Sequence, residues 1–174
     1  MFLSVLFSGC IFSPIKGKGG GPPPPPIYKP PTSPEWVLGN LATAYQHRDP
    51  AAYDTLFDLN YTGMTIDQSN PDSVKSYNFT KADEVEHIWG LYRSTAVVQL
   101  ELTPRLIRYT DLGDPPGWTV IQNPIDKLLI SDNPDSYTIT RDKETIEFHF
   151  KPKTPDPSSP TDTTWTIGRW TEIR

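Results

Sequence analysis

Residues 33–49 read SPEWVLGNLATAYQHRD, and this stretch decides how the fold begins. Ser33 is a preferred helix N-cap, and Pro34 suits the first helical position, where its missing N–H is not needed. The apolar side chains that follow recur at the spacing of one helix face: Val37, Leu41, Ala44 and Tyr45. Asp49 and Pro50 then repeat the cap-and-proline pattern. The sequence therefore predicts a first helix followed at once by a second, short one.

A third helix is predicted from Thr80 onward. Thr80 and Asp83 have the spacing of a capping box, with Asp in the place of the usual Glu. The apolar stripe of this helix consists of Val85, Ile88, Trp89 and Tyr92. Glu84 and Glu86 fall largely on the opposite face, which we expect to be exposed to solvent.

The second half of the chain has the period-two pattern of β-strands. Residues 96–102 alternate between two sets of side chains, as in a strand with one buried face. Residues 137–140 and 145–150 flank a polar turn, so we expect them to pair as a hairpin, with Phe148 and Phe150 on a single face.

The last predicted strand, residues 165–173, changes its pattern part-way. Trp165 and Ile167 are at odd positions and Trp170 is at an even one, so in a regular strand Trp170 would face the opposite side of the sheet. A bulge at Gly168 would bring all three onto one face, because a bulge inserts an unpaired residue into a strand. Helices followed by a run of strands predict an α+β fold.

Composition and spacing exclude several classes of function. The formal net charge is −5, and we find no basic stripe with interleaved aromatic residues, so nucleic acid is not expected as a partner. His47, His87 and His149 lie in different predicted elements, without the spacing of metal ligands. No phosphate-binding glycine loop and no nucleophile elbow is present. The sequence predicts neither a metal nor a cofactor.

The N-terminal segment Leu6-Phe7-Ser8-Gly9-Cys10 resembles a bacterial lipobox, and Cys10 is the only cysteine. The resemblance implies that residues 1–9 are a signal peptide and that Cys10 receives acyl chains. We therefore expect a lipid-anchored, extracytoplasmic protein of the bacterial cell envelope, whose partner is the membrane. The alternative is an N-terminus in which Cys10 is incidental.

A tether is predicted between the anchor and the folded domain. Residues 10–33 are rich in Gly and Pro, and residues 22–26 are an unbroken proline run. Such a run favours polyproline II, a semi-rigid spacer of roughly 3 Å per residue. A proline-rich ligand for the aromatic groove of a partner is the alternative. The folded domain is expected over residues 34–174.

The order of elements and the placement of aromatic residues resemble the nuclear transport factor 2-like superfamily. The segments that carry this resemblance are Glu35–Leu41, Ala44-Tyr45, Arg48-Asp49 with Tyr53, and the closing Trp165–Trp170, which resembles the last strand of lipoprotein members. The resemblance implies a cone, in which a curved antiparallel sheet wraps the long helix and often encloses an apolar pocket. The superfamily includes isomerases, dehydratases, polyketide cyclases and non-catalytic modules, so the fold alone does not select a function.

Aromatic side chains are the candidates for lining such a pocket: Tyr45, Tyr53, Trp89 and Tyr92 from the helices, and Phe148, Phe150 and Trp165 from the sheet. The same rings also fit a packed core without an open pocket. An isomerase would need a carboxylate base and an acidic donor in the pocket, whereas Glu101 and Glu147 alternate with apolar neighbours and are expected to face solvent. No catalytic residue is therefore predicted.

The leading hypothesis is non-catalytic binding of a small apolar ligand or a protein partner in the cone. The alternative is an isomerase- or polyketide-cyclase-like enzyme that uses the same pocket. The resemblance also implies a homodimer formed through the open face of the sheet.

The anchor can be tested by the substitution Cys10→Ala. We expect it to abolish membrane association and fatty-acid labelling in a bacterial host, because the thiol is the acylation site. Membrane fractionation and metabolic labelling with an alkyne fatty acid measure both effects, and Ser4→Ala is the matched control. Unchanged fractionation of Cys10→Ala would contradict the anchor.

Overall fold

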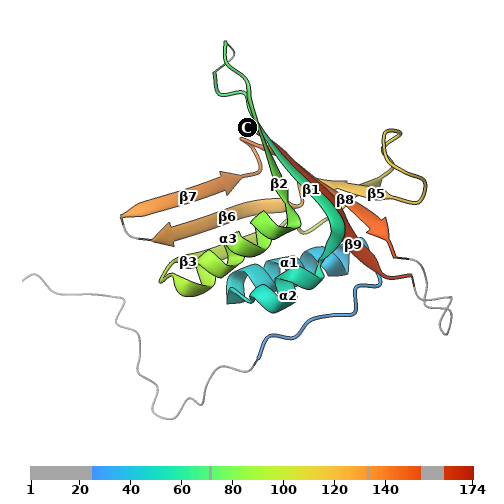
Figure 1. Ribbon diagram of the computed structural model, residues 1–174, viewed down its shortest axis with the longest axis horizontal. Coiled ribbons are helices and arrows are strands. Elements are labelled where there is room, and N and C mark those ends of the chain that lie inside the picture. The colour runs from blue at the N-terminus through green and yellow to red at the C-terminus, as the bar shows by residue number, and fades with distance from the viewer. Residues whose placement is uncertain (1–24, 71, 133, 154–162) are drawn as a thin grey trace, which may run out of the picture.

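The computed structural model describes residues 25–70, 72–132, 134–153 and 163–174. The predicted lipidation site Cys10, the predicted leader and residues 11–24 of the predicted tether lie outside the described residues. The helices of the described part are α1 (Pro34–His47), α2 (Pro50–Thr55) and α3 (Lys81–Arg93) (Figure 1). The strands are β1 (Phe57–Asp67), β2 (Lys75–Thr80), β3 (Val97–Leu102), β4 (Arg108–Tyr109), β5 (Thr119–Gln122), β6 (Ile125–Asp132), β7 (Asp135–Thr140), β8 (Thr145–Pro152) and β9 (Trp165–Ile173). None of the described helices has the length and apolar character to cross a membrane.

Each helix begins where its cap was predicted. Ser33, Asp49 and Thr80 each accept a hydrogen bond from a backbone N–H in the first turn of their helix. The side chain of Asp83 completes the capping box by accepting from the backbone N–H of Thr80 at 2.7 Å. Arg48 adopts a left-handed φ of 51°, which turns the chain from α1 into α2.

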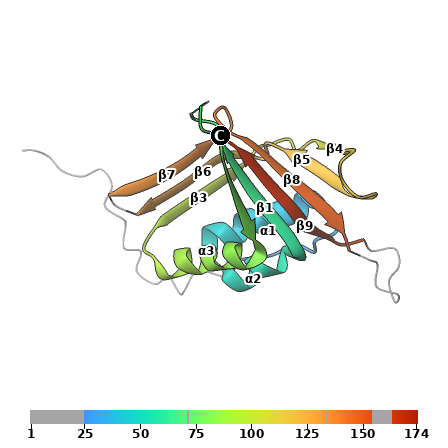
Figure 2. The same cartoon turned by 45° about the horizontal axis from the view of Figure 1, so that its top comes forward.

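The described strands form two sheets. The larger has the order β2-β1-β9-β8-β5-β4, and the smaller has the order β3-β6-β7. The β1–β9 pair is parallel, whereas the other described pairs are antiparallel. Figure 2 shows the strands spreading from the C-terminal end of β9, with the helices across the wide end. The predicted α+β cone is confirmed.

The predicted hairpin of residues 137–140 with residues 145–150 was wrong. Residues 135–140 (β7) pair with β6, and residues 145–152 (β8) pair with β5 and β9. The polar turn between them carries the chain from the small sheet to the large one. A local turn signal is the same for both arrangements, so only the tertiary structure distinguishes them.

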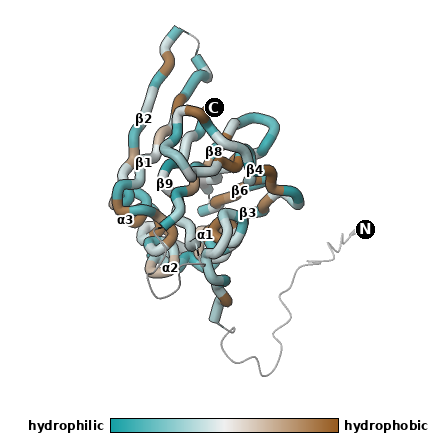
Figure 3. The backbone as a smooth tube through the Cα atoms, turned by 90° about the vertical axis from the view of Figure 1, so that its right-hand side faces the viewer, coloured by the Kyte–Doolittle hydropathy of each residue, from teal (hydrophilic) through white to brown (hydrophobic). Residues whose placement is uncertain are grey.

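Strand β2 was not predicted. All of its residues are exposed, so it lacks the alternation that identifies a half-buried strand. With β1 it forms a long hairpin whose tip projects beyond the rest of the sheet (Figures 1 and 3).

The core lies between α1 and the inner face of the large sheet. Val37, Leu38 and Leu41 on α1 are buried, as are Phe148 and Phe150 on β8. The rings of Phe148 and Phe150 stack with their centroids 6.4 Å apart. The prediction that both rings share one face is confirmed.

Helix α3 differs from the prediction in its orientation. Trp89 is 40% exposed and Tyr92 is 58% exposed, whereas Ile88 and Leu91 are buried. The buried stripe therefore contains Ile88 and Leu91. Compared with the predicted stripe, it is rotated about the helix axis toward Glu84. The two exposed rings pack on each other at 5.3 Å, and Arg93 lies against Trp89.

The segment just upstream of α1 packs on the domain. The Tyr28 hydroxyl donates to Asp49 Oδ2 at 2.8 Å. The backbone of Lys29 exchanges two hydrogen bonds with the Asn40 side chain, at 2.9 and 2.7 Å. The folded part of the chain therefore begins before residue 34.

The predicted bulge at Gly168 is present. His149 pairs with Arg169 and Phe150 pairs with Ile167, so Gly168 is left without a partner in the β8–β9 register. A Cβ at this position would lie 2.6 Å from Cζ3 of Trp118. The indole covers the bulge and leaves no room for a side chain.

We expect Gly168→Ala to lower the free energy of unfolding by about 1–3 kcal/mol, because the rigid Trp118 ring must move. Gly39→Ala is the matched control, since a Cβ there meets no atom within 4 Å. It should raise stability by roughly 0.5–1 kcal/mol, because Ala is a better residue for a helix interior. Denaturant unfolding measures both changes, and a neutral Gly168→Ala would show that the ring is not tightly held.

Candidate functional site

The cone contains a cavity of about 780 Å³ that is open to solvent. Its walls come from α1, α3, β1, β2 and β9, and from β6 and β7 of the small sheet. The residues that determine its chemistry are Tyr45, Tyr61, Phe79, Asp83, Glu84, Glu86, His87, Tyr137, Trp170, Glu172 and Arg174. Cavities of this size hold small organic molecules.

Glu84 of α3 joins three elements inside the cone. Its two carboxylate oxygens accept hydrogen bonds from the hydroxyls of Tyr53 on α2, at 3.0 Å, and Tyr61 on β1, at 2.9 Å. Burial raises the pKa of Glu84, and the two phenol donors oppose this rise. Gly63 makes room for the contact, because a Cβ there would lie 2.6 Å from the Tyr61 hydroxyl oxygen.

Tyr45 and His87 form a second polar pair on the wall. The Tyr45 hydroxyl lies 2.5 Å from His87 Nε2. Burial raises the pKa of the Tyr45 phenol and lowers the pKa of the His87 imidazole below its ordinary 6.5. The phenol is therefore protonated and the uncharged imidazole is favoured, and in this form the hydroxyl donates and Nε2 accepts. The imidazole proton is then on Nδ1.

Glu172 of β9 is a third polar residue of the wall, and unlike Glu84 it has an oxygen that receives no hydrogen bond from a tyrosine. It is 8% exposed, and in the described structure its Oε1 accepts no hydrogen bond. The nearest cation is Arg174, whose Nη1 lies 3.7 Å from this oxygen. Burial raises the pKa of Glu172, and Arg174 opposes the rise. A buried acceptor without a donor is costly, so this oxygen favours any water, ion or ligand group that can donate to it.

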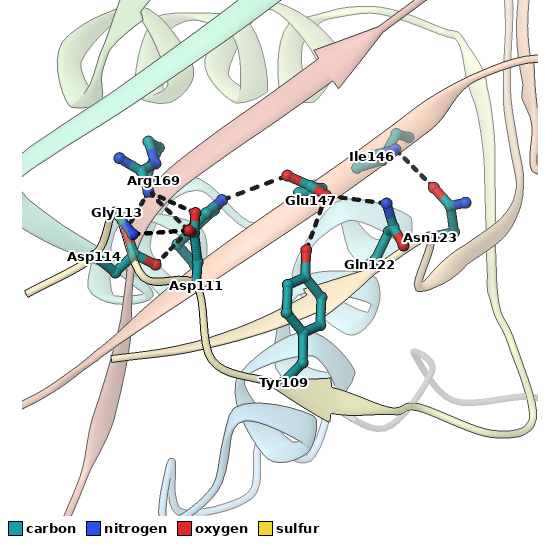
Figure 4. Close-up of polar contacts among 10 residues, drawn as sticks. Tyr109, Asp111, Gly113, Asp114, Gln122, Asn123, Ile146, Glu147 and Arg169 are labelled. Carbon is teal, nitrogen blue, oxygen red and sulfur yellow. Dashed lines mark hydrogen bonds and ion pairs between the residues drawn. The ribbon is translucent and has the colours of Figure 1, made fainter. Parts of the chain in front are cut away.

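A different polar cluster lies on the opposite face of the large sheet. His149 alternates with the two core phenylalanines of β8, and its Nδ1 lies 2.6 Å from Asp114 Oδ2. Asp114 also forms an ion pair with Arg169, near Asp111 (Figure 4). Ligand atoms of Asp111, Asp114 and His149 lie within 4.8 Å of one another, as in a metal site. The Arg169 guanidinium already supplies a positive charge there. We therefore interpret the cluster as an ion-pair network that holds the loop between β4 and β5 on the large sheet.

Glu147 lies on this same outer face. It accepts hydrogen bonds from Tyr109 at 2.8 Å and from Gln122 at 3.0 Å (Figure 4). These contacts tie β8 to β4 and β5, and they direct Glu147 away from the cone.

Solved structures resemble this chain in fold. A nuclear transport factor 2-like protein of unknown function in nutrient uptake from Rhodospirillum rubrum is 13% identical, with a TM-score of 0.51 over 81% of this chain and 97% of that chain. A conserved protein from Planctomyces limnophilus is 8% identical, with a TM-score of 0.52 over 80% and 91% of the two chains. A candidate β subunit of an aromatic-ring-hydroxylating dioxygenase from Novosphingobium aromaticivorans is 10% identical, with a TM-score of 0.53 over 82% and 87%.

The chain has the nuclear transport factor 2-like fold. No family model and no curated protein matches the sequence. At these low identities the likeness establishes the fold and leaves the chemistry of the cone to its own residues.

The nuclear transport factor 2-like cone separates the aromatic residues that were predicted to line its pocket. Tyr45 lines the cavity, and Tyr53 lies behind the wall with its hydroxyl on Glu84. The core contains Phe148 and Phe150, and Trp165 packs at its edge. On the outer side of α3 lie Trp89 and Tyr92. These last five do not line the cavity, because the core fills one part of the cone and leaves another part open.

The sequence interpretation missed the two inward-facing carboxylates of the cavity, Glu84 and Glu172. Glu84 was assigned to the wet side of α3, yet it lies four residues before Ile88 and therefore on the buried face. Glu172 lies two residues after Trp170 and so shares its face of β9. The predicted bulge at Gly168, followed to the end of the strand, would have identified Glu172.

We expect Glu172→Gln to stabilise the protein at neutral pH. Because the pKa of Glu172 is raised in the folded state, the folded protein binds the proton more tightly than the unfolded chain does. This contribution to stability is complete below the ordinary pKa of 4.5 and is lost as the pH rises through the folded pKa. Glutamine is neutral throughout, so the variant should match wild type at pH 4 and melt a few degrees higher at pH 8.

Thermal unfolding from pH 4 to pH 8 measures this difference. The matched control is Glu101→Gln, which neutralises an exposed carboxylate on β3. Its melting temperature should follow that of wild type across the range. A Glu172→Gln protein that melts below wild type at pH 8 would show that the carboxylate is favourably paired.

Proposed function

We propose that the protein binds a small organic molecule in the cone cavity. The observation that carries this proposal is the combination of a cavity of about 780 Å³ with a buried, unpaired acceptor, Glu172 Oε1, on its wall. Small-molecule sites are concave and mostly apolar, with a few convergent polar groups that orient the ligand.

The walls favour a ligand with an apolar body. Met64, Phe79, Ile130 and Ile139 line the cavity from two strand pairs, β1–β2 and β6–β7, together with the Trp170 ring of β9. An apolar ligand would remove the parts of these side chains that are still exposed from water, at about 25 cal/mol for each Å² that is buried.

The alternative, an isomerase- or cyclase-like enzyme, receives less support. Such an enzyme needs a base and a hydrogen-bond donor that faces the oxygen of its substrate. Glu172 suits the base, but the phenol hydrogens of Tyr45 and Tyr61 are directed to His87 and Glu84. The hydroxyl hydrogen of Tyr137 is free to be donated to a substrate. This residue is 39% exposed, however, so water competes for the same hydrogen. We therefore favour binding over catalysis.

The proposal includes the place of the domain in the cell. Cys10, in its small-small-cysteine context, would anchor the domain to the bacterial envelope, and the proline-rich stretch would hold it away from the membrane. The packing of Tyr28 and Lys29 on the domain means that this spacer ends before residue 28. A protein partner and a homodimer stay predictions.

Binding can be tested on the full chain with N-phenyl-1-naphthylamine, a neutral apolar dye that fluoresces when it leaves water. We expect wild type to increase its fluorescence and Ile130→Trp to abolish the increase, because the indole would fill the cavity. The matched control is Val97→Trp on β3, where the native side chain is 65% exposed and lies outside the cavity.

Fluorescence titration gives the affinity of each protein, and circular dichroism confirms that both variants are folded. Equal binding by wild type and Ile130→Trp would place the dye outside the cone. Absence of binding by wild type would contradict the proposal for apolar ligands.

A further inference from the structure

Two of the three phenols that line the cavity use their hydrogens within its wall. The Tyr45 hydroxyl donates to His87 Nε2, and the Tyr61 hydroxyl donates to Glu84 Oε1. Neither hydrogen is available to a ligand, and the one phenol that keeps its hydrogen is the exposed Tyr137. Glu172 Oε1 has no donor among the described residues, although the side chain is almost completely buried. A ligand that satisfies this oxygen must bring a hydrogen-bond donor or a positive charge.

Charge favours the same kind of ligand. The carboxylates that line the cavity are Asp83, Glu84, Glu86 and Glu172. Among the described lining residues, Arg174 is the one permanently charged base, and burial lowers the pKa of His87, which favours its uncharged form. The charges that line the cavity are therefore mostly negative, and Glu84 and Glu172, the least exposed of them, are screened least by water.

Arg174 does not remove the need for a donor at Glu172. Its Nη1 lies 3.7 Å from Glu172 Oε1, beyond hydrogen-bond distance, and the same nitrogen donates to the Tyr137 hydroxyl at 3.3 Å. Arg174 is exposed, so water and salt screen its charge. An ion pair of this kind contributes little, and a ligand cation inside the cone would be screened much less.

The aromatic walls supply the second element of cation recognition. Tyr45, Phe79, Tyr137 and Trp170 line the cavity together with Glu172. The face of an aromatic ring carries partial negative charge and attracts ammonium groups. Rings combined with a carboxylate suit an organic cation, whose charged end can lie at the acid while its carbon atoms contact the rings.

We propose that the cone binds an organic cation, a primary or quaternary amine on an apolar body, with its charged end at Glu172. This inference rests on the proposed function and specifies the class of ligand. An organic anion would face four carboxylates in the cavity. A metal ion would need several oxygen ligands, but both oxygens of Glu84 already accept hydrogen bonds from tyrosines.

Three probes that share a phenyl ring and differ in the charge of their end group test the inference. They are 2-phenylethylamine, 2-phenylethanol and phenylacetate. Amide NMR titrations of the full chain measure each affinity directly and show whether the cavity residues respond. We expect the ammonium compound to bind at least about tenfold more tightly than the alcohol, and phenylacetate to bind most weakly.

The role of Glu172 is tested with Glu172→Gln, and Glu101→Gln is the control. Glu172→Gln should reduce the preference for the amine over the alcohol to within about threefold, while Glu101→Gln should leave it unchanged. The alcohol should bind wild type and Glu172→Gln equally, which shows that the variant cavity is intact. Glu84→Gln provides a second variant, in which a smaller loss is expected because its oxygens already have donors.

The outcomes separate the two proposals. If the alcohol or phenylacetate binds wild type as tightly as the amine, the organic-cation inference is wrong and binding in the cone still stands. If the amine preference survives in Glu172→Gln, the charged end does not lie at Glu172. If neither these probes nor the neutral dye perturbs the cavity residues, the proposed function itself fails.

Discussion

The paired hydrogen bonds of Glu84 are the interaction on which the rest of the cone depends. One carboxylate on α3 accepts from Tyr53 on α2 and from Tyr61 on β1, so it joins two helices and the large sheet inside an apolar interior. Burying a carboxylate is costly unless hydrogen bonds replace its water, and here both oxygens have a phenol donor. The missing side chain of Gly63 is a condition of this arrangement, because any Cβ would displace the Tyr61 hydroxyl.

This interaction also determines what the cavity offers a ligand. Tyr61 faces the open part of the cone, but its hydrogen is directed to Glu84, just as the hydrogen of Tyr45 is directed to His87. The wall is thereby left rich in acceptors, with Glu172 as the member that has no donor of its own. The same contacts that stabilise the fold therefore bias the site toward ligands that donate or carry positive charge.

Local chemistry predicted the starts of the helices and one irregularity of the sheet. The caps at Ser33, Asp49 and Thr80 depend on residues three positions away, and the Gly168 bulge follows from a change of parity within one strand. The partners of β7 and β8 were not predictable in this way, because a polar turn between strands is compatible both with a hairpin and with a crossing between sheets.

The sequence by itself determined the α+β order, the helix boundaries and the aromatic character of the interior, because these follow from side-chain periodicity and from caps only a few residues apart. The tertiary structure decided which aromatic rings pack the core and which line the open cavity. It also decided that Glu84 faces the inside, whereas the side-chain alternation after the Gly168 bulge already indicates this direction for Glu172. Hydrophobic periodicity assigns carboxylates to the surface, and only long-range contacts, such as the two phenols that reach Glu84, reverse that assignment.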